Sequence, residues 1–213
     1  MRNLILLAAF LIGSIISGFA ANYKETMIQT IEKLNKSQDA NELVEIANTF
    51  DRIAQKESTE WLPLYYSAYA TISTTFFNQA MSNEEKIKVF EKAQQKIDQA
   101  KKLADNEDEI YVLQAMIYQL KISTDNNNAY QYILKANEAL GRAESIDANN
   151  PRIPYLKGTT LFYTPTEYGG GASVAKPLFE KAAKLFSEAD QSNQLMPNWG
   201  AYHNNTMLEQ CNK

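Results

Sequence analysis

The chain has 213 residues, of which 45% are hydrophobic and 22% are charged, and its formal net charge at pH 7 is −4. This length and apolar content suit one folded domain with a core of its own. The mild negative charge argues against a nucleic-acid-binding protein, because such proteins present a basic face to the phosphate backbone. With only 8 glycines and long stretches rich in Lys, Glu, Gln and Ala, the composition predicts an all-α protein.

The N-terminal segment has the order of a secretory signal sequence. Arg2 supplies a positive charge, and residues 4–16 are apolar. Gly18 and Ala20 place small residues at the two positions that a signal peptidase recognises. This order predicts a signal peptide over residues 1–20 that is cleaved after Ala20. The alternative is an uncleaved membrane anchor, for which the apolar run is close to the lower length limit.

The part that follows the signal, residues 21–213, is expected to form a single domain without stable membrane insertion. Its only cysteine is Cys211, so no internal disulfide can form. An exported protein that is held together by its core alone fits the periplasm or the cell exterior of a bacterium better than it fits a disulfide-stapled secreted domain.

Nine segments of this domain repeat apolar residues at helical spacing. The clearest start signal is a capping box, in which the Ser82 hydroxyl accepts from the backbone N–H of Glu85 and the Glu85 carboxylate reaches back. Pro151 marks another start, because proline at the first helical position loses no hydrogen bond. The predicted helices cover residues 23–35, 41–56, 60–79, 82–103, 107–123, 129–146, 151–164, 173–189 and 199–210.

Three stretches of the chain share one pattern. Two of them end a helix on a small residue and a Leu or Ile, turn through Asp and Asn, and open a new helix that carries Ala115 or Gly158 at a point of close helix approach. The third, over residues 61–71, is a weaker copy around Ala68. This pattern resembles a divergent tetratricopeptide-type repeat, with units longer than the standard of about 34 residues. The resemblance implies a right-handed α-solenoid of antiparallel helix pairs that binds a partner and is not an enzyme.

In tetratricopeptide arrays the first helix of each pair lines a concave groove. Transferring those positions to this chain gives eight candidate partner- or ligand-binding residues: Tyr65, Tyr69, Met116, Gln119, Arg152, Tyr155, Thr159 and Tyr163. An aromatic groove fits a peptide or another protein of the cell envelope. The alternative is an accessory protein of a transport system, whose array encloses an apolar small ligand. It also remains open that these aromatic residues only pack helix on helix.

Signals of catalysis and of metal or cofactor binding are missing from the sequence. His203 is the only histidine and Cys211 lies off its helical face, so neither metal-ligand spacing nor a nucleophile motif is formed. His203 is therefore interpreted as a partly exposed structural residue. The glycine run 169–171 is interpreted as a tight turn before a helix, with an anion site at that helix start as the alternative.

The signal sequence yields a first prediction. We expect the protein recovered from its native envelope to begin at Ala21, which N-terminal sequencing checks. Replacing Ala20 by Arg should block processing and retain Met1, because the peptidase needs a small residue there. Recovery of the unchanged chain with Met1 in place would contradict the assignment.

Overall fold

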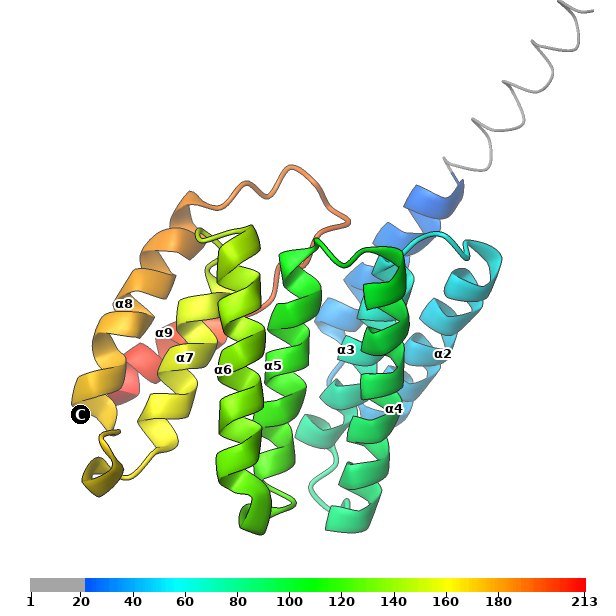
Figure 1. Cartoon of the computed structure of the whole chain (residues 1–213). Helices are drawn as coiled ribbons and strands as arrows, with labels where there is room; N and C mark the ends of the chain where they lie inside the picture. Colours follow the sequence, from blue (N-terminus) through cyan, green and yellow to red (C-terminus); the bar gives the residue numbers. More distant parts are fainter. Residues whose placement is uncertain (1–21) are drawn as a thin grey trace, which may run out of the picture.

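The computed structural model describes residues 22–213, which are α-helical and contain no β-strand (Figure 1). Residues 22–36 are helical, and each predicted helical segment corresponds to one observed helix. The remaining helices are α2 (Ala40–Lys56), α3 (Leu62–Phe77), α4 (Asn83–Leu103), α5 (Asp108–Ile122), α6 (Ala129–Ile146), α7 (Arg152–Tyr163), α8 (Ala172–Glu188) and α9 (Ala201–Gln210), with single 3-10 turns η1 (Asn126–Asn128) and η2 (Thr166–Tyr168).

The predicted signal peptide lies outside the described residues. Within residues 22–213, none of the helices is both long enough and apolar enough to cross a membrane.

Side-chain caps set the beginnings of two helices. The predicted capping box of α4 is confirmed: the Ser82 hydroxyl accepts from Glu85 N–H at 3.3 Å, and the Glu85 carboxylate accepts from Ser82 N–H at 2.8 Å. At α2, the Asp39 carboxylate accepts from two backbone N–H groups of the first turn, at 2.8 and 2.9 Å. These bonds satisfy donors that the helix itself leaves free.

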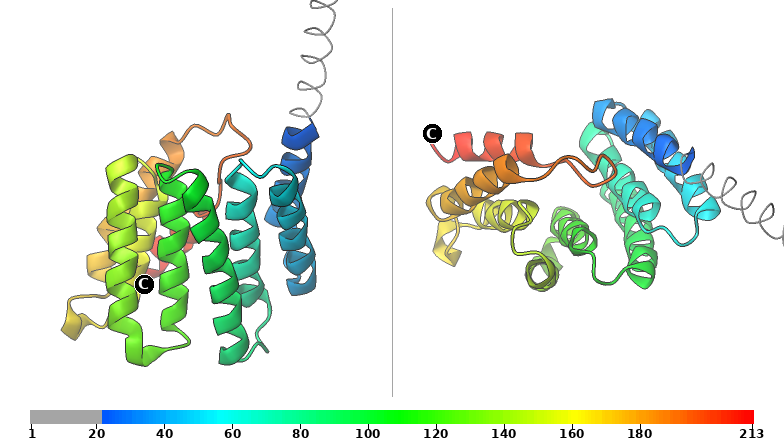
Figure 2. Two further views of the ribbon diagram at one scale, coloured as in Figure 1. Left: turned by 45° about the vertical axis from the view of Figure 1, so that its right-hand side comes forward. Right: turned by 90° about the horizontal axis from the view of Figure 1, so that it is seen from above.

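Consecutive helices from α2 to α9 pack against one another. Helices α2 to α8 stand side by side along a curved row, and α9 lies across the inner side of its last helices (Figure 2). The three small residues of the repeat, Ala68, Ala115 and Gly158, are buried. The core is continuous along the row, because Met116 and Tyr155 each pack against two of its neighbouring apolar clusters. The further assignment of this row to a right-handed solenoid remains a prediction.

Residues 189–200 form an extended strap between α8 and α9. Figure 2 shows the strap crossing the inner side of the curved row and returning to α9. The Tyr66 hydroxyl on α3 donates to the Leu195 carbonyl at 2.9 Å, and the Asn35 amide donates to the Asn198 side chain at 3.3 Å. The strap therefore ties the C-terminal helix to the N-terminal half of the row.

The glycine run before α8 is a tight turn. Gly169 has a φ of 80° and Gly171 a φ of 100°, a region that side chains disfavour. The N–H groups of Gly169, Gly170 and Gly171 all donate to carbonyls of the preceding residues, at 2.8–3.2 Å. The N–H groups of the three glycines are thus used within the turn itself, which agrees with the interpretation as a tight turn before α8.

The contact at Gly158 yields a prediction about stability. A Cβ added there would meet the Phe179 ring at 2.8 Å, whereas a Cβ at Gly141 would meet nothing within 4 Å. We expect Gly158→Leu to lower the free energy of unfolding by about 1–3 kcal/mol, because it overpacks a filled core. Gly141→Leu, in the exposed interior of α6, should be neutral or stabilising by up to about 1 kcal/mol. Urea denaturation of both variants checks this, and equal effects would contradict the close contact.

Candidate functional site

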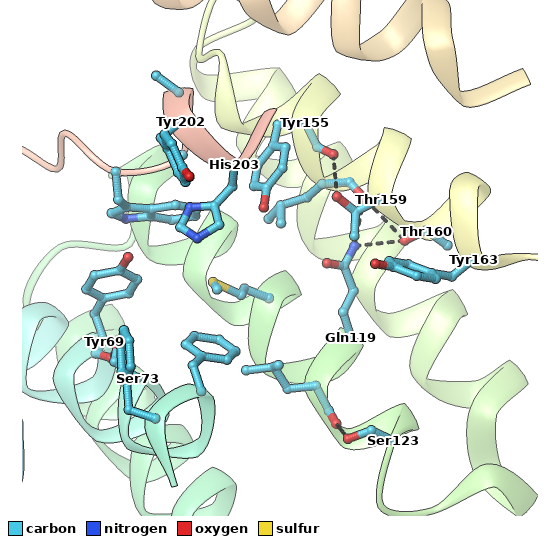
Figure 3. Close-up of a pocket in the computed structure, with 18 of the residues that line it drawn as sticks. Tyr69, Ser73, Gln119, Ser123, Tyr155, Thr159, Thr160, Tyr163, Tyr202 and His203 are labelled. Atoms are coloured by element: carbon cyan, nitrogen blue, oxygen red, sulfur yellow. Dashed lines mark hydrogen bonds between the residues drawn. The ribbon is translucent and has the colours of Figure 1, made fainter. Parts of the chain in front are cut away.

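A groove of about 1240 Å³ lies between the helix row and the C-terminal segment. Most of its lining comes from α3, α5 and α7 on one side and from residues 198–203 on the other, and residues between 34 and 43 and Ile133 of α6 complete it. The rim is open to solvent, since Tyr163 and Tyr202 are 70% and 79% exposed. Figure 3 shows the side chains from these separate elements facing a common space.

Six of the eight predicted site residues line this groove. They are Tyr69, Met116, Gln119, Tyr155, Thr159 and Tyr163. Their helices are α3, α5 and α7, which are the three helices that the tetratricopeptide resemblance assigned to a concave face. That these residues bind a ligand remains a prediction, but their gathering around one space agrees with it.

Tyr65 and Arg152 do not line the groove. Tyr65 is fully buried and Arg152 is 6% exposed, so a ligand in the groove does not reach them. Both were expected on the groove face because the tetratricopeptide resemblance assigned their positions to the concave side of the first helix of a pair. The side chains of Tyr65 and Arg152 instead contact Trp199 of the groove wall, which they support from behind.

Aromatic rings form the inner wall of the groove. The Trp199 ring stacks on the Tyr69 ring at a centroid distance of 5.3 Å and meets the Tyr155 ring nearly edge-on at 6.5 Å. Burial raises the pKa of the Tyr155 phenol to about 12 and that of the Tyr69 phenol well above its ordinary value. Both phenols therefore stay protonated at neutral pH, and the wall carries no charge.

The polar side chains of α5 and α7 are largely engaged within the protein. The Gln119 amide donates to the Leu156 carbonyl at 2.9 Å and to the Thr160 hydroxyl at 2.8 Å, and the Thr159 hydroxyl donates to the Tyr155 carbonyl at 2.9 Å (Figure 3). These bonds fix the spacing of the two helices. Among the described residues that line the groove, none is Asp, Glu, Lys or Arg.

A buried ion pair holds the strap against the back of this wall. The Arg152 guanidinium contacts the Glu109 carboxylate at 2.9 Å and donates a hydrogen bond to the Pro197 carbonyl. The Tyr65 hydroxyl donates to the same carboxylate at 3.4 Å and accepts from the Trp199 indole N–H at 2.8 Å. Burial raises the pKa of the Glu109 carboxyl, and the adjacent guanidinium opposes that shift.

The sequence interpretation missed the C-terminal contribution to the groove. Trp199, Tyr202 and His203 line it, whereas the sequence indicated only a terminal helix with a structural histidine. The one available signal was composition, because the only histidine of the chain and one of its two tryptophans lie four residues apart. Among residues 22–213, no group of three or more His, Cys, Asp or Glu side chains is placed to hold a metal ion.

The comparisons with known proteins find a likeness among solved structures. No family model matches the chain, and no curated protein is significantly similar to it. The chain is similar to the HusA haemophore from Porphyromonas gingivalis, with a TM-score of 0.78 and 28% sequence identity. The alignment covers 89% of this chain and 92% of that chain, so the likeness extends over nearly the whole helix row.

The ion pair behind the wall yields a prediction. We expect Arg152→Met to lower the free energy of unfolding by about 3–5 kcal/mol, because it leaves the buried Glu109 carboxylate without a counter-charge. Adding Glu109→Leu should recover much of this loss. Chemical denaturation of the single and double variants measures both effects.

The matched control for this prediction is Lys157→Met on the same helix. Its ion pair with Glu144, at 2.6 Å, is 31% and 41% exposed, so its loss should cost less than about 1 kcal/mol. Equal losses at Arg152 and Lys157 would show that the buried pair does not hold the strap.

Proposed function

We propose that this protein is an exported, non-catalytic binding protein whose groove holds haem. The observation that carries the proposal is the uncharged groove, walled by the rings of Tyr69, Tyr155 and Trp199. The likeness to a haemophore supports it, since a haemophore is by name a carrier of haem. The predicted signal peptide supports export.

The groove suits a flat, mostly apolar ring system. Pockets for such ligands have aromatic and aliphatic walls with few polar groups. Its volume of about 1240 Å³ exceeds the roughly 300–1,000 Å³ that is common for small-ligand pockets, which leaves room for a macrocycle. Because no described lining residue is Lys or Arg, we expect the haem propionates to point through the open rim into water and not into buried ion pairs.

The wider architecture fits a carrier. We propose that residues 21–213 form one divergent tetratricopeptide-like solenoid after cleavage of residues 1–20. Small buried residues at Ala68, Ala115 and Gly158 support that assignment, because repeat arrays need such points of close approach. A ligand held at an open rim can be passed on, so the protein would act as a haem-binding accessory of an uptake system in the envelope.

A peptide of another envelope protein is the second candidate occupant. Asn35, Gln38 and Asn198 line the groove with amide groups, which are able to pair with an extended peptide backbone. The protein would then act as a scaffold and not as a carrier. The two candidates differ in a simple measurement, because only haem has a strong visible absorbance that changes on binding.

Titration of the mature protein with haemin tests the proposed function. We expect a saturable change in haemin absorbance, together with quenching of the Trp199 fluorescence that a Trp61→Phe background isolates. An unrelated helical protein of similar size serves as the control. A response no greater than that of the control would refute haem binding and favour the peptide.

The exposed rim offers a specific prediction. Tyr163 lines the groove and is 70% exposed, and Tyr168 is 79% exposed but does not line it. We expect Tyr163→Ala to weaken haemin binding by about 1 kcal/mol, or roughly fivefold in Kd, because an aromatic contact with the ligand is lost. Tyr168→Ala should leave the Kd unchanged.

Both tyrosines are exposed, so neither change should alter the melting temperature appreciably. Tyr155 is the less informative target, because its ring also packs near Phe179 at 6.5 Å, and its loss mixes folding with binding. If Tyr163→Ala binds haemin like the unchanged protein, the rim is not part of the haem site.

A further inference from the structure

We propose that one end of the helix row docks on the surface of a phospholipid bilayer without net charge. This end, called the aromatic end below, carries the last turns of α3, α5 and α7 and the loops that follow them, residues 78–82, 123–128 and 164–171. Figure 1 shows the three loops at the lower end of the row, opposite the strap. The proposal does not depend on which ligand the groove holds.

Exposed aromatic side chains gather at the aromatic end. Among the described residues six aromatic side chains are exposed, and all except Tyr202 on α9 stand here, in the last turn of α3, the first turn of α6, the end of α7 and η2. Exposed apolar residues that occur singly are normal on a protein surface, whereas a gathering of them marks a contact surface. The five side chains, with exposed fractions between 44% and 79%, are Phe76, Phe77, Tyr130, Tyr163 and Tyr168.

The charges of the aromatic end disfavour an anionic surface. Residues 76–85, 122–134 and 158–175 contain no Lys or Arg, but they contain four carboxylates. Proteins are drawn to anionic lipid by clusters of basic residues, and carboxylates are repelled by it. The same repulsion disfavours contact with the aromatic end of a second copy of the chain. The four acidic residues are Glu84, Glu85, Asp125 and Glu167.

The composition of the aromatic end suits the headgroup layer of a neutral bilayer. Tyrosine is favoured at that level, because its ring is apolar and its hydroxyl stays hydrated. Ser, Thr, Asn and Gln make up more than half of the residues in the three loops, and they pair with headgroups without burying a charge. A protein interface concentrates its anchors in one packed centre, whereas these rings are spread over separate loops. A bilayer needs no matching shape, so it fits this spread better.

The aromatic end is continuous with the groove. Phe76, Phe77 and Tyr163 also line the groove, whereas Tyr130 and Tyr168 do not. Docking of the aromatic end therefore brings this part of the groove to the bilayer surface. An apolar ligand is then able to pass between lipid and protein with little exposure to water.

Binding to vesicles, without any haemin, tests the proposal. The mature protein is mixed with phosphatidylcholine vesicles, and the bound fraction is measured by flotation. We expect saturable binding that the double change Tyr130→Ala and Tyr168→Ala weakens about tenfold or more, because two rings are lost from the interface. The matched control is Tyr202→Ala, which removes a ring that is 79% exposed on α9 and should leave binding unchanged. All three side chains are exposed, so equal melting temperatures are expected.

Vesicles that also contain phosphatidylglycerol provide the second arm. They should bind the protein more weakly than phosphatidylcholine alone, and added salt should reduce the difference, because the carboxylates are then screened. Failure of the unchanged protein to bind phosphatidylcholine vesicles would overturn the proposal and leave the aromatic end to a protein partner. Binding that needs phosphatidylglycerol, or that persists in the double variant, would place the contact on another face and also overturn it. The haemin titration contains no lipid, so the proposed function and this proposal fail or stand separately.

Discussion

The ion pair between Glu109 on α5 and Arg152 on α7 is the contact on which the groove depends. Both side chains are buried, and the guanidinium also donates to the carbonyl of Pro197 in the strap. Buried charges are tolerated only when each one finds its partners. The Asn150 amide, which donates to the Glu109 carboxylate at 2.6 Å, and the Tyr65 hydroxyl complete the set. The Pro197 carbonyl is one of the partners of the Arg152 guanidinium, so the strap has to pass beside Arg152.

Fixing the strap brings the two sides of the groove together. Trp199 lies two residues after Pro197 and is stacked on Tyr69, so the C-terminal part of the chain forms a wall opposite the helices. The charged groups lie behind this wall, whereas the side that faces the groove is neutral. This division explains how the protein can bury an ion pair beside an uncharged groove. It also places His203, three residues beyond Gly200, in the lining of the groove.

Local sequence signals predicted most of the helices correctly, because helix formation depends on spacing and capping within a few residues. The capping box at Ser82 and the segment 129–146 are examples in which the boundaries agree with the structure. The tetratricopeptide resemblance also selected the faces that carry Tyr69, Met116 and Tyr155. The same resemblance placed Tyr65 and Arg152 in the groove lining, where the structure does not have them. Helical spacing identifies one face of a helix, but it does not say which residues of that face a neighbouring element covers.

The sequence by itself determined that the chain is helical, where its helices begin and end, and that aromatic residues collect on one set of helices. These properties depend on interactions over one or two helical turns. Only the tertiary structure decided that residues 189–200 cross the inner side of the row and that His203 faces Tyr69 and Tyr155. The deciding contacts, from Arg152 to Pro197 and from Trp199 to Tyr65, join residues 45 and 134 positions apart. Such pairings arise from the packing of the whole chain, and no local pattern encodes them.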